Sequence, residues 1–391
     1  MHLDPILPKL FALVVAVLIV DIGMRFLKQP LLVGFILVGI VLGPSGVGLI
    51  DDSSNISQFG NLGVVLLLFY LGMEISIPHL IRGWKIAVIG TSLQIGITLG
   101  LTALVGQLFG WSTAKVVLFG FMLALSSTAV ILRILKEKGE NFTTVGRNVT
   151  GVLLVQDLML APIVIILGFL SGESHFSPVQ FAGQSVGLIA MVAGVIWIAK
   201  HGAIELPFAN YLRENREIQV YAAMAMCFGF ALLTGILGLS TALGAFIGGI
   251  AISQMRGTKW VRESLESFHI FFLGLFFVSI GLLVDVPYVF EQWERIALMV
   301  AVVMIGNTLI NSLLFKALGE SWRDSFYSGS LLSQIGEFSF ILAAIGLQAK
   351  IITSELGYQT ALSVITITLL ISPCWIAIFR RITGYTPENS P

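Results

Sequence analysis

The chain has 391 residues, of which 56% are hydrophobic and only 11% are charged, against roughly 25% charged residues in a soluble protein. Together with a mean hydropathy of +0.94, this composition excludes a soluble globular protein and indicates an integral membrane protein. The 22 basic and 22 acidic side chains cancel, so the chain has no excess positive charge with which to bind a nucleic acid.

Long apolar segments follow one another along the whole chain. A transmembrane helix needs about 20 predominantly apolar residues, and this length predicts thirteen spans. The stretches between them are too short for a soluble domain, so residues 1–391 are predicted to form a single transmembrane domain. The predicted spans are 6–24, 31–49, 58–76, 86–109, 113–136, 147–170, 181–200, 218–236, 239–255, 265–284, 296–318, 327–347 and 357–379.

The basic residues predict the orientation of these spans. Eighteen of the 22 Lys and Arg residues follow odd-numbered spans, and only Lys9, Lys115, Arg295 and Lys350 lie on the other side. Because cytoplasmic loops carry the excess of Lys and Arg, we expect the N-terminus outside and the C-terminus in the cytoplasm of a cell inner (plasma) membrane. Merging the eighth and ninth spans, which only a few residues separate, would destroy this asymmetry.

The thirteen spans divide into six, one and six. The first repeat covers about 6–170, a linker helix about 181–200, and the second repeat about 218–379. The first repeat begins outside and the second begins inside, so the repeats have the opposite orientations found in many secondary transporters. We therefore predict an all-α polytopic membrane protein with two inverted six-helix repeats.

Two carboxylic acids lie near the middle of predicted spans. Asp157 is about ten residues into 147–170 and Glu337 about ten residues into 327–347, which places both near half the hydrocarbon thickness. An ionisable side chain there costs about 2.5–3.5 kcal/mol, so it indicates a functional site. The alternative is a structural acid hydrogen-bonded to a neighbouring helix. Glu74 is closer to a span end, where its charge can reach water.

Polar clusters interrupt the fifth and twelfth spans, which correspond to one another in inverted repeats. The fifth span contains Ser126, Ser127 and Thr128, and the twelfth contains Gln334 next to Gly336 and Glu337. Matching interruptions predict discontinuous crossing helices, whose free carbonyl groups can coordinate a cation. The alternative is that these hydroxyl groups bond only to the preceding helical turn.

Enzymatic and cofactor-binding patterns are absent from the sequence. The five histidines are scattered near span ends without metal-ligand spacing, and no Ser, His and Asp set falls at one membrane depth. We therefore expect a protein that is not an enzyme and that binds no cofactor.

Five stretches resemble the monovalent cation:proton antiporter-2 family, and within it the Kef-type potassium efflux transporters. They occur in order over nearly the whole chain. They are Leu68-Phe69-Tyr70-Leu71-Gly72-Met73-Glu74, Ala124-Leu125-Ser126-Ser127-Thr128-Ala129-Val130, Leu154-Val155-Gln156-Asp157, Gly238-Leu239-Ser240 with Gly244-Ala245-Phe246, and Ser333-Gln334-Ile335-Gly336-Glu337-Phe338.

The resemblance implies the sodium/proton antiporter fold, a homodimer in the lipid bilayer, and a carboxylate, Asp157, that carries cation and proton in turn. Gln156 stands where Kef-type members have Gln and electrogenic sodium antiporters have a second acid. The implied cation- and proton-binding residues are Asp157, Gln156, Ser126, Ser127 and Thr128, with Glu337, Gln334, Asn307 and Glu74 in support.

Two departures from the family pattern affect the expected mechanism. Many relatives have a Lys at the register of Asn307, with Asn311 one turn further on, and its replacement argues against a two-proton mechanism. Kef-type proteins also usually continue into a cytosolic nucleotide-binding regulatory domain, whereas this sequence stops shortly after Arg381. Regulation by such a domain would then require a separate cytosolic subunit.

A single midplane carboxylate suffices for obligatory exchange, because a proton and a dehydrated cation would compete for the same oxygen atoms. The empty, charged carboxylate could not cross the low-dielectric barrier. We expect electroneutral exchange of K⁺ for H⁺, since the pair Gln156 and Asp157 is Kef-like. The alternatives are a sodium/proton antiporter of the same fold, a cation channel, for which no repeated carbonyl filter is visible, and a membrane scaffold that transports nothing.

Overall fold

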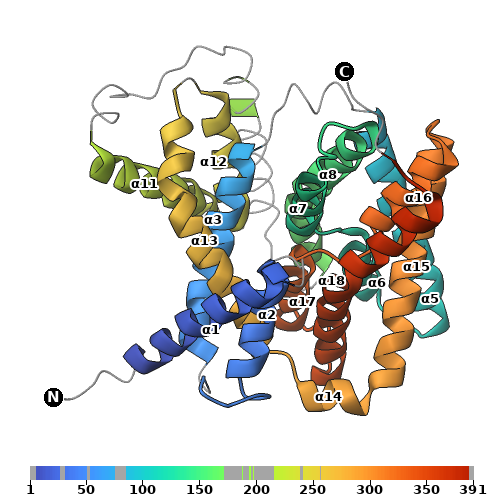
Figure 1. Ribbon diagram of the computed structural model, residues 1–391, viewed down its shortest axis with the longest axis horizontal. Coiled ribbons are helices and arrows are strands. Elements are labelled where there is room, and N and C mark those ends of the chain that lie inside the picture. The colour runs from blue at the N-terminus through green and yellow to red at the C-terminus, as the bar shows by residue number, and fades with distance from the viewer. Residues whose placement is uncertain are drawn as a thin grey trace. The chain divides into compact units, whose positions relative to one another are not determined.

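A computed structural model describes residues 6–26, 31–50, 53–74, 85–170, 215–237, 241–255 and 257–386, with the isolated positions 187, 193, 194 and 197. Within these ranges all regular structure is helical (Figure 1), which confirms the predicted all-α class. The helices are α1 (Ile6–Phe26), α2 (Leu31–Leu42), α3 (Ser53–Glu74), the π-helix η1 (Lys85–Gly90), α5 (Thr91–Leu108), α6 (Thr113–Ala124), α7 (Thr128–Glu137), α8 (Thr144–Leu170), α11 (Arg216–Ile236), α12 (Thr241–Gln254), α13 (Lys259–Leu282), α14 (Val286–Glu291), α15 (Trp293–Ala317), α16 (Trp322–Leu331), α17 (Phe338–Gln348) and α18 (Glu355–Thr383).

Every predicted span except the seventh coincides with a helix or with two consecutive shorter helices. The seventh, 181–200, lies outside the described residues apart from isolated positions, so the number thirteen stays a prediction. Among the described residues, six helices are each long and apolar enough to cross a membrane: α1, η1 with α5, α11, α13, α15 and α18. The protein is therefore a multi-pass membrane protein.

The second helix is shorter than predicted. The apolar pattern extends to residue 49, but α2 ends at Leu42. Gly43 precedes Pro44, and a residue before proline is disfavoured in the helical conformation. The chain then turns back on the helix end: the N–H of Val47 donates to the carbonyl of Val41 at 2.7 Å.

Contacts between residues divide the chain into two compact units. Unit 1 comprises Met1–Asp51, Pro78–Glu173 and Ile280–Pro391, and unit 2 comprises Asp52–Ile77 and Ser174–Ser279. Each unit combines segments from both predicted repeats, so this division does not test the repeat boundaries, which stay a prediction. All the predicted site residues except Glu74 belong to unit 1.

Unit 2 contains α3, α11, α12 and most of α13. Its core includes the buried side chains of Phe69, Cys227 and Val261. A Cβ on Gly249 of α12 would lie 2.1 Å from the carbonyl oxygen of Phe69 on α3. Only glycine permits this backbone approach, which is typical of helix packing in membranes.

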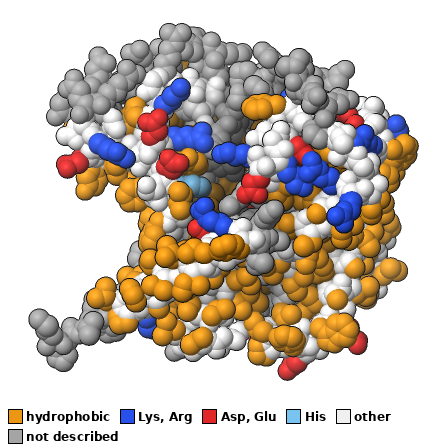
Figure 2. Space-filling model, viewed as in Figure 1, with side chains coloured by type: hydrophobic (Ala, Val, Ile, Leu, Met, Phe, Trp, Pro, Cys, Tyr) orange, Lys and Arg blue, Asp and Glu red, His pale blue; other side chains and the backbone are white. Residues whose placement is uncertain are grey.

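Unit 1 packs helices from distant parts of the sequence against one another. Helix α6 contacts α17, α8 contacts α16, and α5 contacts α15. The colours of Figure 1 show how distant such partners are along the chain, with α8 in green and α16 in orange to red. On the face of unit 1 seen in Figure 2, Lys and Arg side chains gather around α7 and α8, and apolar side chains cover α14 and α15. This separation is expected of helices that cross a bilayer.

Candidate functional site

The first helix break separates α6 from α7. Helix α6 ends at Ala124, residues 125–127 are extended, and α7 begins at Thr128. The Oγ atom of Ser127 caps α7 by accepting a hydrogen bond from the N–H of Val130 at 3.3 Å, as serine commonly does at a helix N-terminus. The predicted interruption of the fifth span is confirmed.

The second break separates α16 from α17. Helix α16 ends at Leu331 and α17 begins at Phe338, so residues 332–337 connect them without regular helix. Ser333 Oγ donates to the carbonyl of Ser330 at 2.8 Å and so closes the end of α16. The predicted interruption of the twelfth span is also confirmed.

The two breaks are in direct contact. The N–H of Gly336 donates to the carbonyl of Leu125 at 2.7 Å, and Ser126 Oγ donates to the carbonyl of Leu332 at 3.0 Å. A Cβ on Gly336 would lie 2.6 Å from the carbonyl carbon and oxygen of Ser126. The crossing of the broken helices therefore depends on glycine at position 336.

Ending α6 in the protein interior frees carbonyl groups that need hydrogen-bond donors. Side chains from three other helices supply them, and these hydrogen bonds hold the break in place. The donations run from Ser339 Oγ to Met122 O at 2.8 Å, from Asn307 Nδ2 to Leu123 O at 2.9 Å, and from Gln94 Nε2 to Ala124 O at 2.8 Å.

Asn307 bridges the two breaks. Its Nδ2 atom also donates to the carbonyl of Ser333 at 3.3 Å, and its side chain is buried. The structure thus places Asn307 at the crossing, where a neutral amide satisfies one carbonyl group from each break. Asn311, one turn further on, donates to the carbonyl of Asn307 in its own helix at 2.9 Å and, among the described residues, to no other helix.

Gln94, which the sequence analysis missed, links α5 to the first break through Gln156. Gln156 Nε2 donates to Gln94 Oε1 at 3.0 Å, and Gln156 Oε1 accepts the N–H of Ser126 at 2.9 Å. Gln156 therefore holds the backbone of the break directly through Oε1 and indirectly, through Gln94, by Nε2. The sequence signal for Gln94 was an uncharged amide within the predicted span 86–109. A search for ionisable residues does not find it.

Asp157 is the central residue of the 27-residue helix α8 and is 3% exposed. Its Oδ2 atom accepts a hydrogen bond from Thr128 Oγ1 at 2.9 Å. Because Thr128 begins α7, the carboxylate is joined to a helix N-terminus, whose partial positive charge favours an anion. Glu337 is also buried and interacts electrostatically with Asp157. The structure thus brings two midplane carboxyl groups to one region.

Gln334 differs from the other amides of the site. Its side chain is 0% exposed, and neither its Nε2 nor its Oε1 has a hydrogen-bond partner within the described part of the chain. A buried amide without partners costs free energy and is a characteristic place for a bound ion or water. Glu74 ends α3 in unit 2, and its side chain lies outside the described residues.

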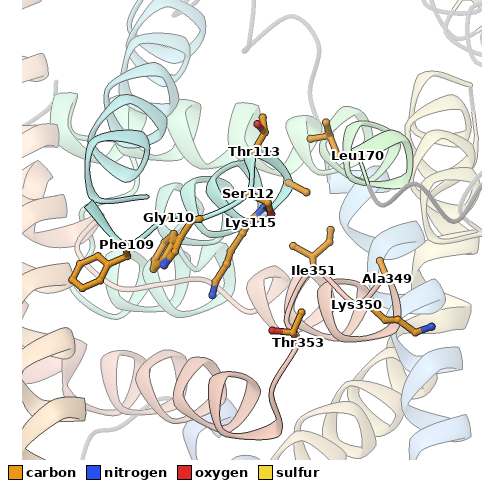
Figure 3. A pocket seen from close by; sticks show the side chains of 12 residues that line it. Phe109, Gly110, Ser112, Thr113, Lys115, Leu170, Ala349, Lys350, Ile351 and Thr353 are labelled. Carbon is orange, nitrogen blue, oxygen red and sulfur yellow. Dashed lines mark hydrogen bonds between the residues drawn. The ribbon is translucent and has the colours of Figure 1, made fainter. Parts of the chain in front are cut away.

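A pocket of about 620 Å³ lies in unit 1 at the ends of α6 and α17 that are remote from the breaks (Figure 3). Lys115 and Lys350 line it and extend in different directions; the Nζ atom of Lys115 lies 5.0 Å from the centre of the Trp111 ring. None of the lining residues within the described part of the chain is acidic. The pocket therefore offers a cation no counter-charge, and the helix crossing is the better candidate for the ion site.

The family model described as "Sodium/hydrogen exchanger, transmembrane" matches residues 10–381. The chain is 33% identical over 373 residues to the iron transporter MagA of Paramagnetospirillum magneticum, covering 95% of this chain and 85% of that protein. It is 29% identical to K(+) efflux antiporter 5 of Arabidopsis thaliana, covering 98% of this chain and 70% of that protein.

Similarity extends to the glutathione-regulated potassium-efflux system protein KefC of Salmonella typhimurium, at 29% identity over 94% of this chain. The chain spans only 59% of that relative's length. Among solved structures, the sodium proton antiporter MjNhaP1 from Methanocaldococcus jannaschii matches with a TM-score of 0.70 and 15% identity, covering 98% of this chain and 100% of that chain. At this identity the match supports the fold alone, and the predicted antiporter fold is confirmed.

Proposed function

This chain belongs to the sodium/hydrogen exchanger family, a family of transporters, and we propose that it exchanges potassium ions for protons by alternating access. The cation and the proton bind in turn to Asp157 at the crossing of the broken helices. Ser126, Ser127 and Thr128 line the site, and Gln156, Asn307, Gln334 and Glu337 support it.

The observation that carries the proposal is the setting of Asp157. It is a buried carboxyl group in the middle of a membrane-spanning helix, and within the described residues no ion pair joins it to Lys, Arg or His. An uncompensated charge at that depth is costly. Either a proton or a cation must therefore neutralise it, and the two compete for the same oxygen atoms.

This competition makes the exchange obligatory. The neutral forms of Asp157, protonated or cation-bound, cross the low-dielectric barrier between the two access states, whereas the empty carboxylate does not. Because Gln156 and Asn307 are uncharged amides that hold the backbone of the breaks, neither adds a second proton. One proton then moves for each monovalent cation, and no net charge crosses.

The choice of K⁺ follows from the relatives, and the ligand atoms indicate a hard cation. Two relatives are named for potassium efflux, and the sequence Gln156-Asp157 is Kef-like. MjNhaP1, named a sodium proton antiporter, makes Na⁺ the second candidate. MagA is named an iron transporter, but the described residues contain no group of three or more His, Cys, Asp or Glu side chains that could hold a metal ion. Carboxylate and hydroxyl oxygen atoms suit a hard cation.

We further propose the membrane orientation, assembly and regulation of the protein. Lys138, Arg323 and Arg380 all lie in segments predicted to be cytoplasmic, and the structure brings Lys138 and Arg380 close enough to interact electrostatically. That end of unit 1 faces the cytoplasm of a cell inner membrane, with the N-terminus outside. The protein forms a homodimer, and a separate cytosolic subunit can regulate it.

Replacing Asp157 tests the function. Purified protein is reconstituted in vesicles with an acidic lumen and a fluorescent pH probe, and each alkali cation is added outside. We expect K⁺ to release luminal protons with the wild type and with the control Glu294→Gln, which changes an exposed carboxylate. Asp157→Asn should behave like vesicles without protein.

Each alternative gives a different result in the same assay. Proton release by Na⁺ and not by K⁺ selects the sodium/proton antiporter. Potassium flux without counter-flow of protons selects a channel, and the absence of any flux with the wild type selects a scaffold. Exchange at the wild-type rate by Asp157→Asn would contradict the assignment of the site.

A further inference from the structure

Glu140 is a completely buried carboxylate in the connection between α7 and α8. It is 0% exposed, and its own N–H donates to the carbonyl of Leu135 at 2.8 Å, which closes the turn. Burying a charge in a protein costs several kcal/mol unless it is paired and hydrogen-bonded. The partners of Glu140 therefore indicate its role.

Two side chains from the second half of the sequence pair with Glu140. Arg380 Nη2, in the last turn of α18, lies 2.7 Å from Glu140 Oε1, and the hydroxyl group of Tyr327, on α16, donates to Glu140 Oε2 at 2.7 Å. The ring of Tyr385 stacks on that of Tyr327 with centroids 4.3 Å apart. We call Glu140, Tyr327, Arg380 and Tyr385 the Glu140 cluster.

Further bonds tie the same segments together around the cluster. Arg323, on α16, donates to the carbonyl of Gly384 and, at 2.8 Å, to Thr386 Oγ1. Asn148, in the first turns of α8, donates to Glu320 Oε1 just before α16, at 2.8 Å. The start of α8, the segment that begins α16 and the residues after α18 are thus held in one place.

The cluster lies away from the breaks on the helices that form them: Glu140 follows the end of α7 that is remote from the first break, and Tyr327 lies near the middle of α16. Helix α7 has ten residues and runs from Thr128 at the first break to the Glu140 turn. Helix α16 also has ten residues and runs to the second break. Each is about 15 Å long at 1.5 Å per residue. Because α7 and α16 are stiff, fixing the distance between them at the cluster also fixes the distance between the two breaks.

Stability alone does not account for the cluster, because replacing a buried ion pair by apolar residues is often neutral or stabilising. We propose that Glu140 is a positioning residue for transport, whose paired carboxylate holds α7 and α16 at a fixed spacing so that both breaks move as one body. The inference rests on the proposed exchange activity, and it concerns residues outside the ion site.

Substitutions of Arg380 and Glu140 test the inference in the vesicle assay, on protein that elutes as a single folded species. We expect Arg380→Gln to raise the apparent KM for K⁺ severalfold, because the ion ligands lose their spacing. Arg380→Lys, which can still pair with Glu140, should recover most of the wild-type KM. The control is Arg381→Gln, which removes the same charge from the exposed neighbouring residue and should leave the KM unchanged.

The double variant Glu140→Gln with Arg380→Gln separates an effect on the positions of the helices from an effect on the stability of the protein. It has no unpaired buried charge, so its thermal unfolding should return toward that of the wild type, while its KM for K⁺ stays raised. A wild-type KM in Arg380→Gln or in the double variant would overturn the inference and leave the cluster as a purely structural feature.

A cross-link tests the single-body motion directly. The two free cysteines, Cys227 and Cys374, are replaced by alanine, and Asn148→Cys at the start of α8 is joined to Glu320→Cys before α16 by a short bismaleimide, since the side chains at these positions are in contact. We expect exchange to persist after cross-linking, because these positions do not separate during transport. Loss of exchange on cross-linking would overturn the inference. Failure of the proposed function would appear separately, as no exchange by the wild type.

Discussion

The first break, at residues 125–127, and the second break, at residues 332–337, touch one another but satisfy their polar groups differently. Around the first break, Gln94, Asn307 and Ser339 donate to the carbonyl groups at the end of α6, and Gln156 accepts the N–H of Ser126. In the second break, the buried amide of Gln334 has no hydrogen-bond partner among the described residues.

We infer from this difference that the two breaks have different roles. A break at which side chains from several other helices hold backbone groups resists changes of shape, because each lost bond would leave a buried polar group unpaired. A break with an unpaired buried amide retains the capacity to bind an ion or a water molecule. Substitutions around the first break should therefore act on folding, and those in the second break on ion binding.

The largest effect is expected for Asn307→Leu. The change removes one donor to each break and leaves the carbonyl groups of Leu123 and Ser333 without that donor, at about 1–3 kcal/mol for each unpaired group. We expect a clear fall in the thermal unfolding temperature in detergent and loss of exchange. Asn311→Leu is the matched control, because among the described residues Asn311 donates only within its own helix. An equal fall in the control would break the comparison.

A smaller effect is expected for Gln94→Leu. Ala124 O and Gln156 Nε2 lose their partner, but Gln156 still accepts the N–H of Ser126. The break therefore keeps part of its hydrogen bonding. We expect a smaller fall in the thermal unfolding temperature than in Asn307→Leu, and a rate of exchange about tenfold lower, which corresponds to about 1.4 kcal/mol. Gln107→Leu, on the exposed face of the same helix, should exchange at the wild-type rate. A wild-type rate in Gln94→Leu would show that the Gln94 link is dispensable.

The smallest effect on folding is expected for Gln334→Leu. Because the amide has no partner to lose, replacing it with an apolar side chain should leave the unfolding temperature unchanged or raise it slightly. The apparent KM for K⁺ should nevertheless rise, since the unpaired amide oxygen is no longer there to support cation binding. Gln348→Leu, an exposed position at the end of α17, is the control. A large loss of stability in Gln334→Leu would erase the distinction between the breaks.

The five motifs that resemble a known family predicted more of the fold and of the site than the apolar pattern of the sequence did. It pointed to the antiporter fold and to Asp157, Gln156, Asn307 and Glu337 as residues of one site. The structure brings these residues together in unit 1, and their roles in transport stay a prediction. The sequence did not indicate Gln94 or Glu140, since an amide in one span and an acid in a loop carry no signal until their partners are known.

The sequence by itself determined that this is a multi-pass membrane protein and predicted its spans, because apolar length and the placement of Lys and Arg are local properties of the chain. It also located both breaks, since runs of Ser, Thr, Gln and Gly are poor continuous helix formers in an apolar setting. Only the tertiary structure decided which atoms satisfy the freed backbone groups. Those partners are up to 217 residues apart along the chain, as Met122 and Ser339 are, and packing alone brings them within hydrogen-bond distance.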